Sequence, residues 1–422
     1  MKVVTTLNRP VRIGKLTLRN RLFRAPLLEG AGVSEDGCAT YMKHFVPNAQ
    51  AGVGLIIQGT TCVTAEGRPS PGMTAIDTRV DMMALEPMTR AVHQAGSAII
   101  IQLGHGGIHC IEGWHNKFKA ERKALPLAVS SPGIAHRLIT GKVHVMSTAE
   151  VKGMVARFGL VARWAREAGY DGVEIAGANG KMMHQFFSRT YNRRTDEYGG
   201  TLENRTRFLR EIRAAIMQEA GDDFPVTLKF PALEEHWWKG GITLEEGLQI
   251  ARIAEDCGYD GLTPVSAHAN PNGAFCRGDF PQASFENKRL RTLLDESMGK
   301  YKVKFLERLM RKVVEKYPFE EAWNLPIFSA VKQVVSIPVS AVGGIRTREA
   351  ANKLLGHEEA DVIGVGRPFY TDPDLARMFL KDESFSLRCN NCNRCILPQL
   401  LGHPGVCYNP ASNRKDRLQQ AA

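Results

Sequence analysis

Short runs of apolar, often β-branched residues alternate along the chain with longer amphipathic stretches. The two most apolar runs, VGLIIQG and AIIIQLG, are seven residues long, which suits buried strands and is too short to span a bilayer. The stretch MSTAEVKGMVARFGLVARWAREA begins with a capping box, Ser147 and Glu150, and repeats apolar residues at helical spacing. The pattern therefore predicts strand–turn–helix units that repeat along the chain.

Two of these units have the same beginning, GYDG, in GYDGVEI (169–175) and GYDGLTP (258–264), and each follows a predicted helix. Parallel strands require such crossover helices. Eight strands are predicted: Arg21–Leu28, Val53–Gly59, Ala98–Gly104, Gly172–Ala176, Pro225–Phe230, Gly261–Ser266, Ile337–Gly343 and Asp361–Arg367. Eight such units predict an α/β fold, a (β/α)8 TIM barrel with its chemistry at the carboxyl ends of the strands. The alternative, a doubly wound sheet, calls for a GxGxxG fingerprint after its first strand, and the sequence has none there.

Two stretches of the sequence are longer than the connections that a plain (β/α)8 barrel requires. One is the loop from His105 to about Val145, and the other is a basic helical stretch, Ser284–Trp323, between the sixth and seventh strands. Loops at the catalytic face of a barrel shape access to the site, so both are candidate lids. We expect a barrel over residues 1–380 with a helical insertion at 284–323, followed by a Cys-rich segment at 381–422.

Composition and charge narrow the class further. With 43% hydrophobic and 23% charged residues among 422, the chain is typical of soluble globular proteins. The N-terminus has no apolar signal core, which predicts a cytoplasmic, reducing location and no membrane partner. The net charge is +11, and Lys288–Lys316 contains ten Lys or Arg against four Asp or Glu. Such a stretch can attract nucleic acid or an anionic substrate, but we interpret it as a solvated helical face and predict no nucleic-acid partner.

Four of the nine cysteines lie near the end of the chain in the pattern C-x2-C-x2-C-x11-C: Cys389, Cys392, Cys395 and Cys407. In a reducing compartment, cysteines grouped in this way are more often metal ligands or redox groups than disulfides. Four thiolates at short spacing with one remote ligand suit an iron–sulfur cluster, and a structural zinc is the alternative.

Glycines follow both of the last two predicted strands, in SAVGGIR (340–346) and GVGRPFYTDPDLARM (364–378). Their backbone N–H groups can approach an anion closely, and a short helix beginning near Asp374 can add its dipole. Arg367 supplies a forked positive charge. Gly343, Gly344, Gly366 and Arg367 therefore predict a phosphate site, the alternative being glycines that serve only to turn the chain.

The segment FFSRTYNRRTDEYGGTLENRTRFLREI (186–212) closely resembles the signature of the Old Yellow Enzyme family, the FMN-dependent NAD(P)H:flavin oxidoreductases. RNRLFRAPL, IQLGHGG and DVIGVGRPF support the resemblance, which extends in the same order over roughly residues 8 to 410, apart from the Ser284–Trp323 insertion and parts of the His105–Val145 loop. The resemblance implies a (β/α)8 barrel that holds FMN at its mouth, with NAD(P)H as an electron donor.

Positions in the family's motifs assign flavin contacts to residues of this chain. The resemblance implies that Pro26 and Leu27 back the isoalloxazine, that Gly59 lies beside it and that Gln102 hydrogen-bonds the pyrimidine edge. Lys229 takes the place of the basic residue near flavin N1 and O2, where a cation stabilises the anionic reduced flavin. Family members usually have Arg there, and Lys keeps the charge but loses the fork. The glycine loops and Arg367 would hold the FMN phosphate.

The Cys-rich segment resembles that of the 2,4-dienoyl-CoA reductase and trimethylamine dehydrogenase branch of the family. This implies that the four cysteines bind a 4Fe–4S cluster close to the flavin. The branch continues into a second half that binds FAD and NAD, whereas this sequence stops at Ala422. Two routes for electrons follow: direct reduction of FMN by NAD(P)H, or delivery through the cluster by a separate electron-transfer partner protein.

The expected catalytic motif is altered in the stretch AGANGKMMHQFF. Ala176 stands where the family has its first substrate-binding His, Asn179 is retained, and Lys181 replaces the proton-donating Tyr. Some relatives bind the flavin covalently through a Cys at the position of Leu28, and a leucine side chain cannot form that bond. His268, just after the sixth strand, is placed like a catalytic His of the iron–sulfur branch and suits general acid catalysis. Lys181 is the other candidate acid, provided that desolvation lowers its pKa.

Three functions are predicted. The first is reduction of an activated C=C bond, in an enoyl- or dienoyl-CoA or a cyclic enone, by hydride transfer from flavin N5. The second is an amine- or alcohol-type dehydrogenase that sends electrons out through the cluster. The third is an electron-transfer subunit of a larger flavoprotein complex. A small-molecule substrate is expected in the first two, the basic insertion is a candidate contact for CoA phosphates, and a homo-oligomer is compatible with all three.

Overall fold

The protein is described by a computed structural model that covers residues 5–110, 124–133, 141–235, 241–268, 276–381 and 385–412. At its centre, eight parallel strands pair in the order β10-β9-β8-β5-β4-β3-β12-β11. They are β3 (Leu22–Arg24), β4 (Leu55–Cys62), β5 (Ala98–Gly104), β8 (Val173–Ala176), β9 (Val226–Glu235), β10 (Gly261–His268), β11 (Ser340–Val342) and β12 (Val362–Val365). The backbone N–H of Leu262 donates to the Pro338 carbonyl at 2.9 Å and joins the two end strands. The predicted (β/α)8 TIM barrel is confirmed.

The strands differ from the predicted ones mainly in length. The third strand, Ala98–Gly104, has the predicted bounds, whereas β4 and β9 run further. In β4 the register shifts between Gln58 and Thr61, and this bulge lets the strand continue to Cys62. The strands β3 and β11 are shorter than predicted: the residues after Arg24 leave the sheet to form a loop at the barrel mouth, whereas β11 begins three residues later than predicted, at Ser340.

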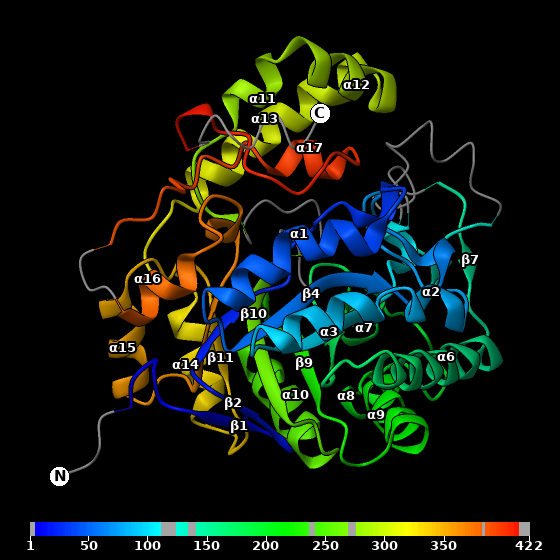
Figure 1. Cartoon of the computed structure of the whole chain (residues 1–422). Helices are drawn as coiled ribbons and strands as arrows, with labels where there is room; N and C mark the ends of the chain where they lie inside the picture. Colours follow the sequence, from blue (N-terminus) through cyan, green and yellow to red (C-terminus); the bar gives the residue numbers. More distant parts are fainter. Residues whose placement is uncertain are drawn as a thin grey trace.

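Helices surround the barrel on its outside (Figure 1). The longer ones are α1 (Gly37–Gln50), α3 (Glu86–Gln94), α6 (Thr148–Glu167), α9 (Arg207–Ala220), α10 (Leu244–Asp256), α14 (Leu325–Lys332) and α15 (Arg348–Gly356). Shorter ones are α2 (Arg79–Met83), α7 (Met182–Phe187), α8 (Leu202–Arg205) and α16 (Leu375–Lys381). The helix α6 begins at the predicted capping box, in which Glu150 N donates to Ser147 Oγ at 3.2 Å. Its buried Phe158 packs edge-on against Phe208 of α9.

Two short pairs of strands lie outside the barrel. The hairpin of β1 (Val11–Ile13) and β2 (Leu16–Leu18) is antiparallel, and β6 (Leu127–Ala128) pairs in parallel with β7 (His144–Val145). The second pair belongs to the predicted lid from His105 to Val145, of which residues 111–123 and 134–140 lie outside the described part of the chain. No helix in the described ranges is long and apolar enough to cross a membrane.

The basic insertion forms three helices between β10 and β11: α11 (Gln282–Glu286), α12 (Lys288–Met298) and α13 (Lys300–Lys316). The side chain of Asn287 caps α12 by accepting a hydrogen bond from Leu290 N at 3.0 Å. These helices pack against α17 (Ile396–Leu400), which follows the first three tail cysteines. Figure 1 shows the tail, in red, between the insertion and the body of the barrel. The insertion and the Cys-rich segment therefore form one packed layer.

Candidate active site

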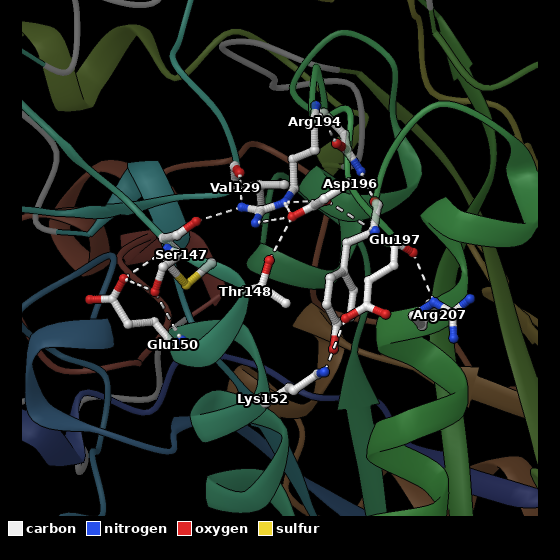
Figure 2. Close-up of polar contacts among 12 residues, drawn as sticks. Val129, Ser147, Thr148, Glu150, Lys152, Arg194, Asp196, Glu197 and Arg207 are labelled. Carbon is white, nitrogen blue, oxygen red and sulfur yellow. Dashed lines mark hydrogen bonds and ion pairs between the residues drawn. The ribbon is translucent and has the colours of Figure 1, made fainter.

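The segment 186–212 is held at the barrel mouth by a buried arginine (Figure 2). Arg194 pairs with Asp196 at 2.6 Å and donates to the carbonyl oxygens of Val129 at 2.8 Å and Met146 at 2.6 Å. Thr148 Oγ1, at the start of α6, donates to the same carboxylate at 2.8 Å. The hydrogen bonds from Arg194 lower the pKa of Asp196 to about 2. The signature segment is thus tied to two parts of the connection between β5 and α6.

A polar cluster crosses four neighbouring strands at the floor of the mouth. Gln102 of β5 donates to Glu174 of β8 at 2.6 Å, and Thr263 of β10 donates to the same carboxylate at 3.1 Å. Burial raises the pKa of Glu174. Burial also lowers the pKa of Lys229, on β9, while the nearby charge of Glu174 opposes that shift. Two residues predicted to contact the pyrimidine edge, Gln102 and Lys229, are therefore linked through one buried acid.

Glu174 is absent from the sequence-based predictions. Its signal was an acidic residue in the middle of the apolar strand GYDGVEI, a position where a carboxylate requires a buried partner. That partner comes from other strands, distant in sequence, so the residue could be noticed in the sequence but not given a role.

The predicted flavin-backing residues form one wall of the mouth. Pro26 and Leu27 are half-buried in the loop after β3. A Cβ added to Gly59 would overlap the carbonyl oxygen of Leu27, so only glycine allows this close approach. Behind the wall, Arg24 and Glu29 form a fully buried ion pair at 2.7 Å, which fixes the two ends of the loop relative to each other.

The glycine loops after β11 and β12 present free donors. No described residue accepts a hydrogen bond from the backbone N–H of Gly343, Gly344, Gly366 or Arg367. Gly343 and Gly344 have φ of 140° and 77°, and a Cβ on Gly344 would lie 2.7 Å from the Glu320 carbonyl oxygen. Unpaired N–H groups on two adjacent loops fit a phosphate, so the residues present suit the FMN phosphate at this position.

The side chain of Arg367 faces the tail rather than the glycine loops. Its guanidinium donates to Asn393 Oδ1 and, at 2.8 Å, to the carbonyl oxygen of Arg277. Arg346, which follows the other glycine loop, donates to the carbonyl oxygen of Cys389 at 2.6 Å. The contact of Arg346 was not predicted. Each glycine loop is thus followed by an arginine that ties it to the Cys-rich segment.

The altered catalytic motif forms a tight turn after β8. Asn179 has a positive φ of 54° and is exposed at the mouth. His184 Nδ1 accepts a hydrogen bond from Gly180 N at 3.0 Å, and its Nε2 lies 3.6 Å from the carboxylate of Glu234, with both side chains buried. The hydrogen bond from Gly180 to His184 therefore helps to hold the turn that presents Asn179.

The two candidate acids come from different elements of the barrel. Lys181 is half-buried at the N-terminus of α7, with its Nζ 4.0 Å from the sulfur of Met73. His268 is the last residue of β10, paired in register with Glu235 of β9, and its side chain lies outside the described residues. Both backbones are at the carboxyl end of the barrel, where catalytic groups of this fold are expected.

All four tail cysteines line one partly open pocket of about 320 Å³: Cys389, Cys392, Cys395 and Cys407. The loop around it turns at Asn391 and Asn393, which adopt left-handed conformations with φ of 60° and 56°. Burial raises the pKa of the Cys395 thiol to about 12. Within the described ranges, no three His, Cys, Asp or Glu side chains are grouped as ligands of a single metal ion. The residue types present, four cysteines that line one pocket, fit an iron–sulfur centre.

The tail pocket shares a wall with the predicted flavin site. Gly405 N donates to the carbonyl oxygen of Glu29 at 3.0 Å, and a Cβ on Gly405 would overlap the Leu28 carbonyl. Tyr370, which also lines the pocket, donates to the same Leu28 carbonyl at 2.9 Å. The loop that backs the predicted flavin position is therefore the surface on which the Cys-rich segment rests.

A closed barrel whose mouth combines glycine loops bearing free backbone N–H groups with a cluster of Gln102, Glu174 and Lys229 fits a flavin-dependent oxidoreductase. Sequence comparison identifies the family. The chain belongs to the NADH:flavin oxidoreductase / NADH oxidase family, whose sequence profile matches residues 6–269. Flavin-dependent oxidation and reduction is the chemistry for which this family is named.

Among its relatives, the NADH oxidase of Thermoanaerobacter brockii is 29% identical over 413 residues, and the cinnamate reductase of Clostridium sporogenes is 29% identical over 429. These alignments cover 94% and 96% of this chain but only 56% and 58% of those proteins. The chain thus spans little more than half the length of these two relatives. By contrast, a 4,4'-dithiodibutanoate disulfide reductase of Rhodococcus erythropolis, 28% identical, is covered to 91%.

Solved structures agree on the fold. A 2-naphthoyl-CoA reductase superposes with a TM-score of 0.74 at 20% identity, covering 96% of this chain and 57% of that one. Histamine dehydrogenase from Rhizobium sp. 4-9 gives 0.75 at 22% identity, covering 95% and 51%. At such identities the structural similarity establishes the barrel fold only. The substrate and the direction of the reaction have to be inferred from the residues of the site.

Proposed function

We propose that the protein is an FMN- and 4Fe–4S-containing oxidoreductase that reduces an activated C=C bond, in an enoyl- or dienoyl-CoA or a cyclic enone. The observation that supports this most directly is the pocket lined by four cysteines, which rests on the loop behind the predicted flavin position. The names of two relatives, a cinnamate reductase and a 2-naphthoyl-CoA reductase, favour the same chemistry. The proposal places the chain in the iron–sulfur branch with 2,4-dienoyl-CoA reductase and trimethylamine dehydrogenase.

When bound, FMN supplies the hydride from N5. The free N–H groups of the two glycine loops, at Gly343, Gly344, Gly366 and Arg367, would bind its phosphate. Pro26, Leu27 and Gly59 would form the wall behind its ring. Gln102 would hydrogen-bond the pyrimidine edge, oriented for this by its bond to Glu174. Lys229 would place a positive charge near N1 and O2, which favours the anionic reduced form.

The substrate would be oriented and protonated by residues of the altered motif. Asn179, exposed at the mouth, would donate a hydrogen bond to the substrate carbonyl oxygen. His268 would donate the proton to carbon, because an imidazole titrates near neutral pH, with Lys181 as the alternative donor. In single-turnover reactions with pre-reduced enzyme, His268→Ala should slow product formation far more than Lys181→Met. The reverse ranking would assign the proton to Lys181.

Cys389, Cys392, Cys395 and Cys407 would bind the 4Fe–4S cluster, which would exchange single electrons with FMN. The donor of those electrons is either NAD(P)H acting at the barrel mouth or a partner protein acting through the cluster. Addition of NADH and then NADPH to the anaerobic protein distinguishes the two routes, since direct reduction bleaches the flavin without any partner.

The deciding experiment is an anaerobic visible spectrum with iron and acid-labile sulfide analysis. We expect about four irons and four sulfides per chain. Cys395→Ser should lose the iron absorbance and retain FMN, whereas Cys257→Ser, a half-buried cysteine at the end of α10, should keep both. Flavin with zinc in place of iron would leave the barrel assignment standing and overturn the cluster.

A dehydrogenase that oxidises an amine or alcohol and sends electrons out through the cluster is the second candidate. It is favoured by Ala176 and Lys181, which leave the usual enone clamp incomplete, and by relatives named histamine dehydrogenase and N,N-dimethylglycine/sarcosine dehydrogenase. Anaerobic titration with an amine that bleaches the flavin and reduces the cluster would establish this direction. If neither amines nor enones react, while the cluster still exchanges electrons, the chain acts as an electron-transfer subunit.

A further inference from the structure

The basic insertion is the support on which the tail pocket is built. Phe285, Leu294 and Val303 of α11–α13 form an apolar cluster with Leu397, two residues beyond Cys395. Just before these helices, Asp279 N donates to the carbonyl oxygen of Asn391 at 3.0 Å, between two of the cysteines. The insertion therefore lies directly over the proposed cluster site.

The outer face of α13 combines exposed aromatic and basic side chains. Tyr301 and Phe305, one helical turn apart, are 88% and 69% exposed. They are the only large apolar side chains of the insertion that the described structure leaves exposed. Lys302, Lys304 and Arg308 are exposed on the same helix and make no ion pair with any described residue. Two exposed rings among unpaired cations are unusual on a surface that contacts only water.

The acidic residues of the insertion offset this face only in part: Glu296 and Glu315 are exposed on α12 and α13, and Lys288–Lys316 keeps ten Lys or Arg against four Asp or Glu. Asp295 pairs with Arg291 at 3.2 Å, and Glu307 pairs with Arg291 at 3.6 Å and Arg311 at 3.1 Å. Both carboxylates are thus engaged by partly buried arginines between α12 and α13. The remaining positive charge is left on the outside.

We propose that this face of α13 is the docking site for an acidic one-electron carrier protein, which exchanges electrons with the cluster beneath it. The inference rests on the proposed function. Protein interfaces concentrate aromatic residues at their centre and use charge at the rim to steer approach, and α13 provides both. Each encounter oxidises one reduced carrier and reduces the cluster by one electron. Two encounters, with two protons from solvent-linked acids, supply what reduction of one C=C bond requires.

Charge reversal tests the docking face. The holoenzyme variant Lys302→Glu/Lys304→Glu/Arg308→Glu is compared with Lys15→Glu/Arg252→Glu/Lys353→Glu, which changes the net charge equally on exposed residues of the β1–β2 hairpin, α10 and α15. The probes are two purified acidic carriers, a flavodoxin and a plant-type ferredoxin, measured by surface plasmon resonance. We expect association of at least one carrier to slow about tenfold or more in the α13 variant and to change little in the control.

Further measurements separate this inference from its alternatives. Added salt should weaken wild-type binding and reduce the difference between wild type and the α13 variant. Tyr301→Ser/Phe305→Ser should speed dissociation. If neither carrier binds wild type, or if both charge variants lose binding equally, the docking face is overturned. It is also overturned if the α13 variant instead loses affinity for phosphatidylserine vesicles or for an acyl-CoA.

Failure of the docking proposal can be distinguished from failure of the proposed function, because different measurements test the two. Iron, sulfide and FMN contents test the cofactors and should be the same in wild type and both charge variants. Loss of carrier binding with unchanged cofactors supports docking. Absence of iron in the wild-type protein removes the proposed cluster whatever the carriers do.

Discussion

Arginines at two places on the barrel mouth differ in what they join. Arg194 pairs with a carboxylate two residues away and with two carbonyl oxygens of the connection between β5 and α6, so none of these contacts reaches the Cys-rich segment. Arg346 and Arg367 instead reach from the glycine loops to the Cys-rich segment. The first arrangement maintains the shape of the mouth, whereas the second makes the position of the glycine loops depend on the tail.

Loss of the Arg194 clamp should have the largest effect. In Arg194→Ala, the carboxylate of Asp196 and two carbonyl oxygens lose their donor at once, which should lower the free energy of unfolding by about 3 kcal/mol. Urea denaturation measures the change. Arg207→Ala, which removes a single partly exposed bond to the Glu197 carbonyl, is the control and should cost less than about 1 kcal/mol. Equal losses in the two variants would contradict a special role for the clamp.

The same clamp should give stability an acid-dependent part. Arg194 lowers the pKa of Asp196 from 3.8 to about 2 in the folded protein. A depressed carboxyl pKa contributes stability that is complete above about pH 4 and is lost as the pH falls towards 2. The difference in unfolding free energy between wild type and Arg194→Ala should therefore shrink between pH 5 and about pH 2. A difference that stays constant over this range would exclude the ion pair as its source.

Loss of the Arg346 contact should have a smaller, local effect. In Arg346→Ala the carbonyl oxygen of Cys389 loses a charged donor, and hydrogen exchange of amides in 389–395 should rise about tenfold. Global unfolding should change little, because the contact joins the tail to one loop only. Lys353→Ala, on the exposed face of the following helix, is the control. Faster exchange spread over the whole barrel would show that the two arrangements are not separable.

The smallest effect is expected on the exposed face of α13. Tyr301→Ser and Phe305→Ser remove side chains that contact mainly water, so each should change the free energy of unfolding by less than about 0.5 kcal/mol. Thermal unfolding checks this. A loss of 2 kcal/mol or more would mean that these rings stabilise the insertion and are not free for a partner.

Structural features that depend on residues close together in the sequence could be predicted from it. The eight strands followed from apolar runs and their spacing, and the start of α6 followed from Ser147 and Glu150, which contact each other within one turn. Strand ends were less accessible, because β4 passes through a bulge and β9 runs on to Glu235 in pairing with β10.

Structural features that depend on contacts between residues far apart in the sequence could not be predicted in this way. The contact of Arg346 with Cys389 and the packing of Phe285 on Leu397 join residues far apart in the sequence, with no pattern that relates them. Glu174 could be noticed but not explained, because its partners come from three other strands. The flavin-contact and catalytic residues remain predictions. Those for Gln102 and Lys229 are supported by the proximity of both side chains to Glu174.

The closure of the barrel between β10 and β11 has a consequence for folding. These strands are separated by more than seventy residues, including the whole insertion, and β11 is only three residues long. They are joined at the base by a bridge between Leu262 and Val339 and a backbone hydrogen bond to Pro338, and further along by the Asn324 amide, which donates to Pro264 of β10 and Val342 of β11. Since a long loop must close before so few contacts form, we expect this seam to assemble last. The order of events would make the tail pocket, which rests on the insertion, the final part of the protein to mature.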